Sequence, residues 1–202
     1  MKVVESKTFQ LIAGDAALDL VNTLDWRFRE TGADELLVSY NDLLSFSEQA
    51  RLLSPLAARA LRESTPRAGA RALRAARNLR ELCAMAFYAF LDGKAPDSEA
   101  AAGLERHFKA AHASQRLGIQ KSRLGWSFED MRDADLPVWL LAIRAESLLT
   151  SSDEMGLVRA CDAPSCRWLF LDSSKNHSRR WCDMKVCGNR VKARRFKAVH
   201  GS

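Results

Sequence analysis

The sequence lacks the features that mark membrane and secreted proteins. Its 202 residues contain no uncharged apolar run of about 18 residues, so we expect no membrane-spanning helix. The first residues, Met1 to Lys7, carry charges where a secretory signal needs an apolar core. We therefore expect a cytoplasmic location, in which cysteine thiols stay reduced.

Catalytic motifs are missing as well. The chain has no nucleophile elbow, no glycine-rich phosphate loop and no metalloprotease helix. His107 and His112 are five residues apart, whereas a helical metal-binding pair prefers a spacing of four, so we interpret both as surface residues. We expect that the protein is not an enzyme.

Four of the five cysteines are present in a metal-binding pattern. Cys161 and Cys166 form one pair and Cys182 and Cys187 another, each with four residues between its members. Four thiolates suit one tetrahedral, structural Zn²⁺. Two disulfides or an iron–sulfur cluster are the alternatives, but the odd cysteine count and the reducing compartment argue against disulfides. The fifth, Cys83, lies in an apolar helical stripe and reads as a core thiol.

The residues between the two pairs predict a β-hairpin. An aromatic and aliphatic run, 167–171, is followed by a polar turn, and 179–182 returns toward the second pair. Gly188 and Asn189 precede good helix formers, so we expect a helix there, whose exposed N–H groups favour thiolates. A loop, a hairpin and a helix with a ligand pair at each end are the layout of a treble-clef zinc finger. Trp168 and Trp181 are expected in its small core.

These residues resemble the CGNR zinc finger. The resemblance rests on Cys161-x₄-Cys166-x-Trp-Leu-Phe-Leu-Asp172, on Asn176-x-Ser-Arg-Arg-Trp-Cys182 and on Cys187-Gly-Asn-Arg190. Upstream, the stretch Leu18-Asp-Leu-Val-Asn-Thr-Leu-Asp-Trp-Arg27 is similar to the opening of the ABATE domain that accompanies this finger. Together they imply a bacterial protein with a treble-clef finger and a role in stress-linked transcription regulation. They supply neither a ligand nor a DNA site.

Positive charge is concentrated at the C-terminal end. Residues 161–202 hold ten Lys and Arg against three Asp, a net charge of +7, whereas the rest of the chain sums to −1. Such asymmetry favours a polyanionic partner, above all double-stranded DNA. Alternatives are a solvated basic helix on a purely structural finger, or one that docks an acidic protein. The candidate nucleic-acid contacts are Arg179, Arg180, Arg190, Lys192, Arg194, Arg195 and Lys197.

Apolar periodicity upstream predicts a mostly helical domain with a few short strands, an α+β fold. The expected helices cover residues 17–26, 40–53, 55 onward, 68–91, 98–113 and 136–150, and the expected strands lie at 2–11, 35–38, 115–120 and 123–128. We place the N-terminal domain at 1–152 and the finger at 153–202, with the polar segment Ser151 to Glu154 between them.

A polar and aromatic cluster in the first of these helices is a candidate ligand site. Asp19, Asn22, Trp26 and Arg27 lie off or at the edge of its apolar stripe, as the polar groups of a small-molecule pocket would. Helix capping and hydrogen bonding across the domain interface are the alternative. The N-terminal domain is therefore a candidate sensor of a small-molecule effector. Because a single short finger needs a second contact for affinity, a homodimer is a further expectation.

Overall fold

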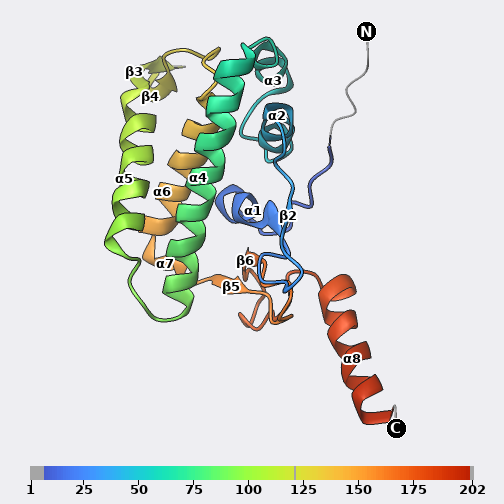
Figure 1. The fold of residues 1–202 in the computed structure, drawn as a ribbon. Coiled ribbons are helices and arrows are strands. Elements are labelled where there is room, and N and C mark those ends of the chain that lie inside the picture. The colour runs from blue at the N-terminus through green and yellow to red at the C-terminus, as the bar shows by residue number, and fades with distance from the viewer. Residues whose placement is uncertain (1–6, 121, 201–202) are drawn as a thin grey trace.

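The computed structural model describes residues 7–120 and 122–200, which form a helical body (residues 7–155) and a small finger (residues 158–200) (Figure 1). The helices of the body are α1 (Ala16–Asn22), α2 (Tyr40–Gln49), α3 (Pro55–Leu61), α4 (Pro66–Leu91), α5 (Ser98–Ala113), α6 (Leu136–Thr150) and α7 (Ser152–Met155). The finger contains the single turn η1 (Met184–Gly188) and the helix α8 (Asn189–His200).

Helix starts follow the capping residues in the sequence. The side chains of Asp15, Ser39, Ser54 and Asp97 each accept a hydrogen bond from a backbone N–H of the first helical turn. At Ser39 the bond is reciprocal, because Asp42 accepts from the backbone N–H of Ser39 at 2.7 Å. These predicted starts are confirmed.

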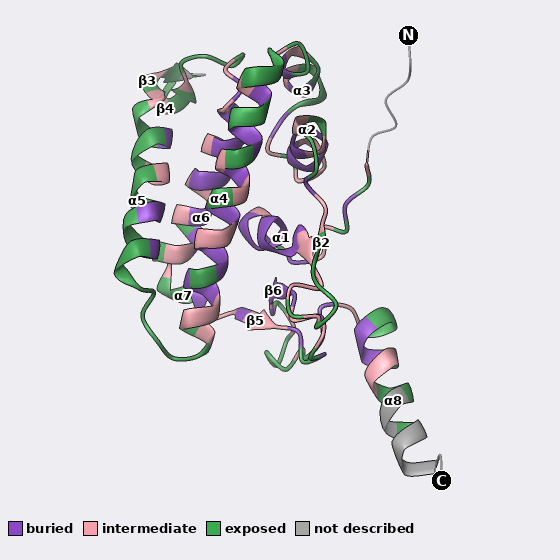
Figure 2. Cartoon of the chain, in the orientation of Figure 1, coloured by how far each residue is buried: buried purple, intermediate pink, exposed green. Residues whose placement is uncertain are grey.

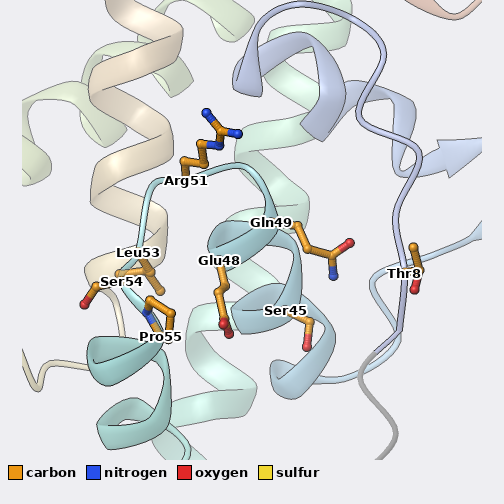
Figure 3. A pocket seen from close by; sticks show the side chains of 8 residues that line it. All are labelled: Thr8, Ser45, Glu48, Gln49, Arg51, Leu53, Ser54 and Pro55. Carbon is orange, nitrogen blue, oxygen red and sulfur yellow. The ribbon is translucent and has the colours of Figure 1, made fainter.

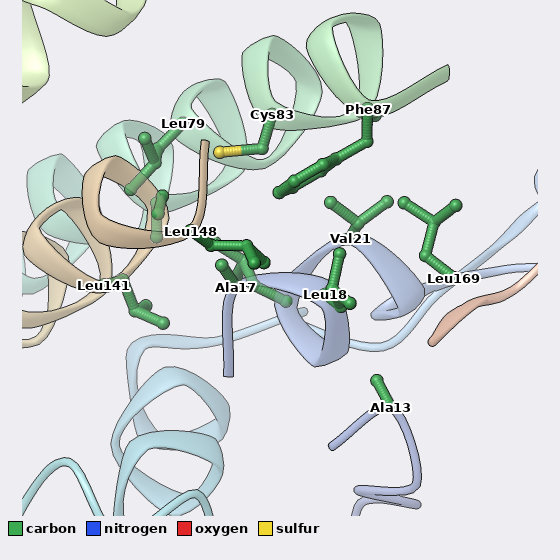
Figure 4. Packing of buried hydrophobic residues seen from close by; sticks show 14 of the residues in the cluster. Ala13, Ala17, Leu18, Val21, Leu79, Cys83, Phe87, Leu141, Leu148 and Leu169 are labelled. Atoms are coloured by element: carbon green, nitrogen blue, oxygen red, sulfur yellow. The ribbon is translucent and has the colours of Figure 1, made fainter. Parts of the chain in front are cut away.

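The core lies where α4 packs on α1, α5 and α6. α1 is buried almost throughout (Figure 2), and Leu79, Cys83 and Phe87 of α4 point toward it (Figure 4). This apolar side of α4 is the one that the sequence predicted. Cys83 is fully buried, which confirms a packed core thiol, and this burial raises the pKa of the thiol well above its usual range.

The strands form three separate antiparallel pairs among the described residues. β1 (Leu24–Asp25) pairs with β2 (Asp34–Glu35), and β3 (Gln115–Gln120) pairs with β4 (Arg123–Phe128). β5 (Val158–Ala160) pairs with β6 (Leu169–Leu171). The α+β, predominantly helical class is therefore confirmed, as is the β3–β4 hairpin.

Some predictions for the N-terminal part are wrong, among them the strand at 35–38, of which only Glu35 is paired. Residues 7–11 form no strand, and residues 2–6 of that predicted strand lie outside the described residues. The first helix ends at Asn22 and not at Trp26, because Thr23 caps it through a hydroxyl bond to Leu20 O at 2.6 Å. The chain then turns through Trp26, whose φ of 53° is incompatible with a right-handed helix.

The predicted hairpin inside the finger is also wrong. β6 pairs with β5, which precedes the first cysteine, and residues 179–182 form no strand. The returning segment is held by single bonds instead: Arg179 N donates to Asp172 Oδ2 at 2.9 Å, and Asp162 N donates to Arg180 O at 2.9 Å. The treble-clef assignment stays a prediction.

The body and the finger share one continuous hydrophobic core. Buried residues of α1, α4 and α6 belong to the same cluster as Leu169, Phe170 and the four cysteines of the finger. Leu171 N also donates to Ala13 O at 2.8 Å. In contrast, α8 projects away from the body (Figure 1). No helix within 7–120 or 122–200 is long and apolar enough to cross a membrane.

Candidate metal centre and nucleic-acid interface

The four predicted ligands come together. The Sγ atoms of Cys161, Cys166, Cys182 and Cys187 all lie within 4.8 Å of one another, and all four residues are buried. The Cys166–Cys182 and Cys182–Cys187 sulfur separations are 3.6 and 3.7 Å. A tetrahedron of sulfurs around zinc at about 2.3 Å has edges of about 3.8 Å. The donor set and its spacing therefore fit one Zn²⁺.

Short backbone loops place each cysteine pair. In the first, Cys166 N and Arg167 N both donate to Ala163 O, at 2.9 and 3.2 Å, and Arg167 has a φ of 56°. In the second, Cys187 N and Gly188 N both donate to Asp183 O, at 2.9 and 3.2 Å. The two loops differ in size, since the carbonyl of the first is bonded from three and four residues ahead and that of the second from four and five, but both turn their thiols toward one point.

The four thiols oppose one another's ionisation. Hydrogen bonds from Cys166 and Cys182 lower the pKa of the Cys161 thiol. The same contacts raise the pKa of Cys166 and Cys182, and burial raises that of Cys187. A dication that binds all four sulfurs stabilises them as thiolates, as Zn²⁺ does in a closed structural site.

Three of the predicted nucleic-acid contacts, Arg179, Arg180 and Arg190, have partners inside the protein. Arg179 stacks on Phe170 with its guanidinium 4.3 Å from the ring centroid, and it donates to the carbonyls of Trp181 and Cys182. Arg180 pairs with Asp162 at 2.6 Å but stays exposed.

Arg190 links the finger to the body. Its guanidinium lies 4.5 Å from the centroid of Trp26, and its Nη2 lies 3.2 Å from Cys187 Sγ. The ring of Trp26 is thus a body surface against which the first turn of α8 rests.

The other predicted contacts all lie on α8. Lys192 is exposed, whereas the side chains of Arg194, Arg195 and Lys197 lie outside the described residues. Of the two tryptophans expected in the finger core, Trp168 is buried and donates to Asp25 Oδ1 at 2.8 Å, and Trp181 is half-buried.

The predicted ligand cluster lies at the junction of body and finger. Asp19 Oδ1 accepts from Ala13 N at 3.0 Å, and Arg27 forms an ion pair with Glu81. The Asn22 amide donates to Leu169 O and accepts from Leu169 N, both at 2.9 Å. The cavity that Asp19 and Asn22 help to line has only about 10 Å³, and the neighbouring one beside Trp26 has about 60 Å³. These contacts favour the interface alternative, and ligand binding there stays a prediction.

A groove that the sequence did not predict is larger. It has about 660 Å³ and lies between residue 8, α2 and the start of α3 (Figure 3). Ser45, Glu48, Gln49 and Arg51 line it with polar atoms. Its volume is in the range of small-molecule sites. No local motif marks it, because it forms only when the chain after Arg51, which has a φ of 59°, doubles back.

A buried ion network that the sequence did not reveal fixes the segment around Trp26. Arg80, 4% exposed, binds Glu35 at 2.7 and 2.8 Å and Glu81 at 2.7 Å. Arg77 also contacts Glu35, and Glu81 in turn holds Arg27. The network links both ends of the 24–35 segment to α4, and it therefore fixes the position of the backbone at Trp26.

Comparison with known families gives two adjoining matches. Residues 14–152 match the ABATE family, which is described as "putative stress-induced transcription regulator". Residues 158–200 match the CGNR zinc finger. No curated protein matches the chain.

Proposed function

This chain belongs to the ABATE family and carries a CGNR zinc finger, and we propose that it regulates transcription in the bacterial cytoplasm by binding double-stranded DNA through α8. The observation that carries the proposal is the placement of the basic helix. α8 holds five Lys and Arg within 12 residues and projects from the molecule, while its base is fixed by the cysteine site (Figure 1). A helix of about 18 Å can lie in a major groove about 12 Å wide.

The internal contacts divide the basic residues into two groups. Arg179 and Arg190 serve the finger itself, since their guanidinium groups are bound to Phe170, Trp26 and nearby carbonyl or sulfur atoms. Lys192, Arg194, Arg195 and Lys197 follow on the projecting part of α8, and we assign the phosphate contacts to these four. Exposed Arg180 can add a contact at the edge.

The test is a titration of the zinc-loaded protein with labelled duplex DNA at several salt concentrations. Each phosphate contact contributes a slope of about −0.9 in log affinity against log salt. Arg194→Ala/Lys197→Ala should weaken binding and make the slope shallower by roughly 1.8. Arg67→Ala/Arg74→Ala removes the same charge from exposed positions of α4 and is the matched control, for which we expect an unchanged slope.

If the α8 variant and the control lose the same affinity for duplex DNA, net charge alone attracts DNA to the protein. Failure of the wild type to bind at low salt would overturn the proposal and favour the alternative, a structural finger on a protein-interaction or ligand-binding module.

The proposed function includes no catalysis, because four thiolates leave zinc without an open coordination position.

A small-molecule effector is the second part of the proposal. The groove in Figure 3 is a better candidate for it than the cluster around Asn22, since the groove, unlike the cavity beside Asn22, has the volume of a metabolite site. A thermal-shift screen with Asn22→Ala and Gln49→Ala variants distinguishes the two locations.

A further inference from the structure

We propose that Trp26 of the body is a positioning residue for DNA binding, which holds α8 in its direction through the contact with Arg190. The consequence for DNA rests on the proposed function, whereas the contact does not. Among the described side chains of α8, Arg190 and Val191 are half-buried. The exposed ones are Asn189, Lys192, Ala193 and Phe196. The direction of α8 is therefore set within its first turn.

The Arg190 guanidinium lies between the body and the cysteine site. It is 4.5 Å from the centroid of the Trp26 ring, and its Nη2 is 3.2 Å from Cys187 Sγ. Tryptophan is the best ring for a cation–π contact, and the planar guanidinium of arginine stacks well on it. A hydrogen bond to a thiolate sulfur is strengthened by charge. One side chain of α8 thus joins the helix to a body residue and to a metal ligand.

Trp26 faces the finger directly. Val186 of η1 and Arg190 of α8 both line the cavity of about 60 Å³ beside the Trp26 ring. Small-molecule sites are several times larger, at about 300–1,000 Å³. The ring therefore meets η1 and α8 without room for a metabolite between them, which suits a contact that positions the helix.

The backbone at Trp26 is held in an unusual conformation. Its φ of 53° is uncommon for a residue with a bulky side chain and persists only where the surroundings fix it. Asp25 Oδ1 accepts from Trp26 N at 2.7 Å and from Trp168 Nε1 at 2.8 Å, so one oxygen joins this turn to the finger. On the other side of Trp26, Arg27 pairs with Glu81 of α4. The body and the finger together place the ring under α8.

Loss of this contact should change the affinity for DNA but not the number of phosphate contacts. A helix that is already fixed loses little conformational freedom when it binds, whereas a helix that pivots about η1 must be ordered first. The loss is limited by the strength of a partly desolvated cation–π contact, which corresponds to about 5- to 30-fold in affinity. Lys192, Arg194, Arg195 and Lys197 stay on α8, so the salt slope should remain the same.

The experiment combines NMR relaxation of backbone amides with titration of labelled duplex DNA, both on the zinc-loaded full chain. In Trp26→Ala, order parameters in the first two turns of α8 should fall from about 0.85 to below about 0.6, while those of α4 stay unchanged. DNA affinity should fall by about 5- to 30-fold with an unchanged salt slope. Trp26→Phe keeps an aromatic face and should restore most of the order and of the affinity.

Phe28→Ala is the matched control, because it removes an aromatic ring from the same segment. Phe28 is 50% exposed and packs edge-on against Tyr88 of α4, with ring centroids 5.2 Å apart. It should leave α8 as ordered as in the wild type and the DNA affinity unchanged. Zinc content and circular dichroism are measured for every variant and should match the wild type.

Four results would overturn the proposal: unchanged order of α8 in Trp26→Ala, equal loss of order in Trp26→Phe, equal loss in Phe28→Ala, or loss of zinc from Trp26→Ala. The relaxation measurement needs no DNA, so it separates this inference from the proposed function. If the wild type does not bind duplex DNA and Trp26→Ala still frees α8, the DNA-binding function fails and the contact remains as the hold on the helix.

Discussion

The body and the finger are stabilised by different means. In the body, α1, α4 and α6 bury large aliphatic and aromatic side chains over many helical turns. In the finger, two strands of three residues and one short turn surround four cysteines, and polar groups such as Asp172 fix the loops. The comparison shows that the body depends on a repeated pattern, whereas the finger depends on single residues at fixed spacing.

Removal of zinc should cause the largest loss of structure, and this loss should be limited to the finger. Structural zinc sites contribute about 10–16 kcal/mol of apparent binding free energy, and the short elements of the finger add few large apolar side chains to the shared core. After chelation, we expect residues 158–200 to lose protection in hydrogen–deuterium exchange while α4 and α6 keep theirs. Unchanged protection of the finger would show that its packing on the body suffices.

A core substitution in the body tests whether apolar packing stabilises this part of the molecule. Phe87→Ala removes a fully buried ring of α4 and should cost about 3–5 kcal/mol in the free energy of unfolding, measured with urea. Phe90→Ala, at a position 43% exposed on the same helix, is the matched control and should cost far less. Similar losses at both positions would contradict the burial of this helical face.

Asp19 makes the stability of the junction depend on pH. Burial raises the pKa of Asp19 to about 7, with Asp15 adding to the effect. Between pH 4 and 7 the folded protein binds more protons at this site than the unfolded chain, so stability falls as pH rises across this interval. Asp19→Asn should therefore stabilise the protein by up to about 4 kcal/mol above pH 7 and by little near pH 4. A pH-independent difference between wild type and variant would refute this assignment.

The hydrogen bonds between Asn22 and Leu169 test the junction itself. Asn22→Ala leaves a buried N–H and a buried C=O of Leu169 without their partner, at a cost of about 2–4 kcal/mol. Exchange protection should fall in β5 and β6 before it falls in α5. Asn41→Ala, at an exposed asparagine of α2, should change stability by less than about 0.5 kcal/mol. Equal effects of the two substitutions would deny Asn22 a role at the interface.

The sequence predicted the parts of the fold that local rules govern. Helix starts at Ser39 and Asp97 follow from side-chain capping, and the apolar side of α4 follows from its period. The four cysteines were predictable because metal ligands must recur at spacings that short loops can close.

What the sequence did not predict depends on partners far along the chain. Leu169–Leu171 pairs with Val158–Ala160 because its side chains are buried against α1, which no local pattern in the finger indicates. Trp26 leaves the helix because ion pairs of α4 fix the following segment. Arg190 and Trp26 are also far apart in the sequence, so no local pattern indicates that Arg190, predicted as a DNA contact, rests on Trp26.

The most direct test of the central claim compares DNA binding by the same chain with and without zinc. The zinc-loaded protein should bind duplex DNA with a salt slope that reflects several phosphate contacts, each worth about −0.9. The chelated protein should bind more weakly and with a changed slope, because the finger no longer holds α8 in place. If affinity and slope are the same in both states, the basic segment acts as an unstructured polycation, and the zinc-organised finger is not the DNA-binding element.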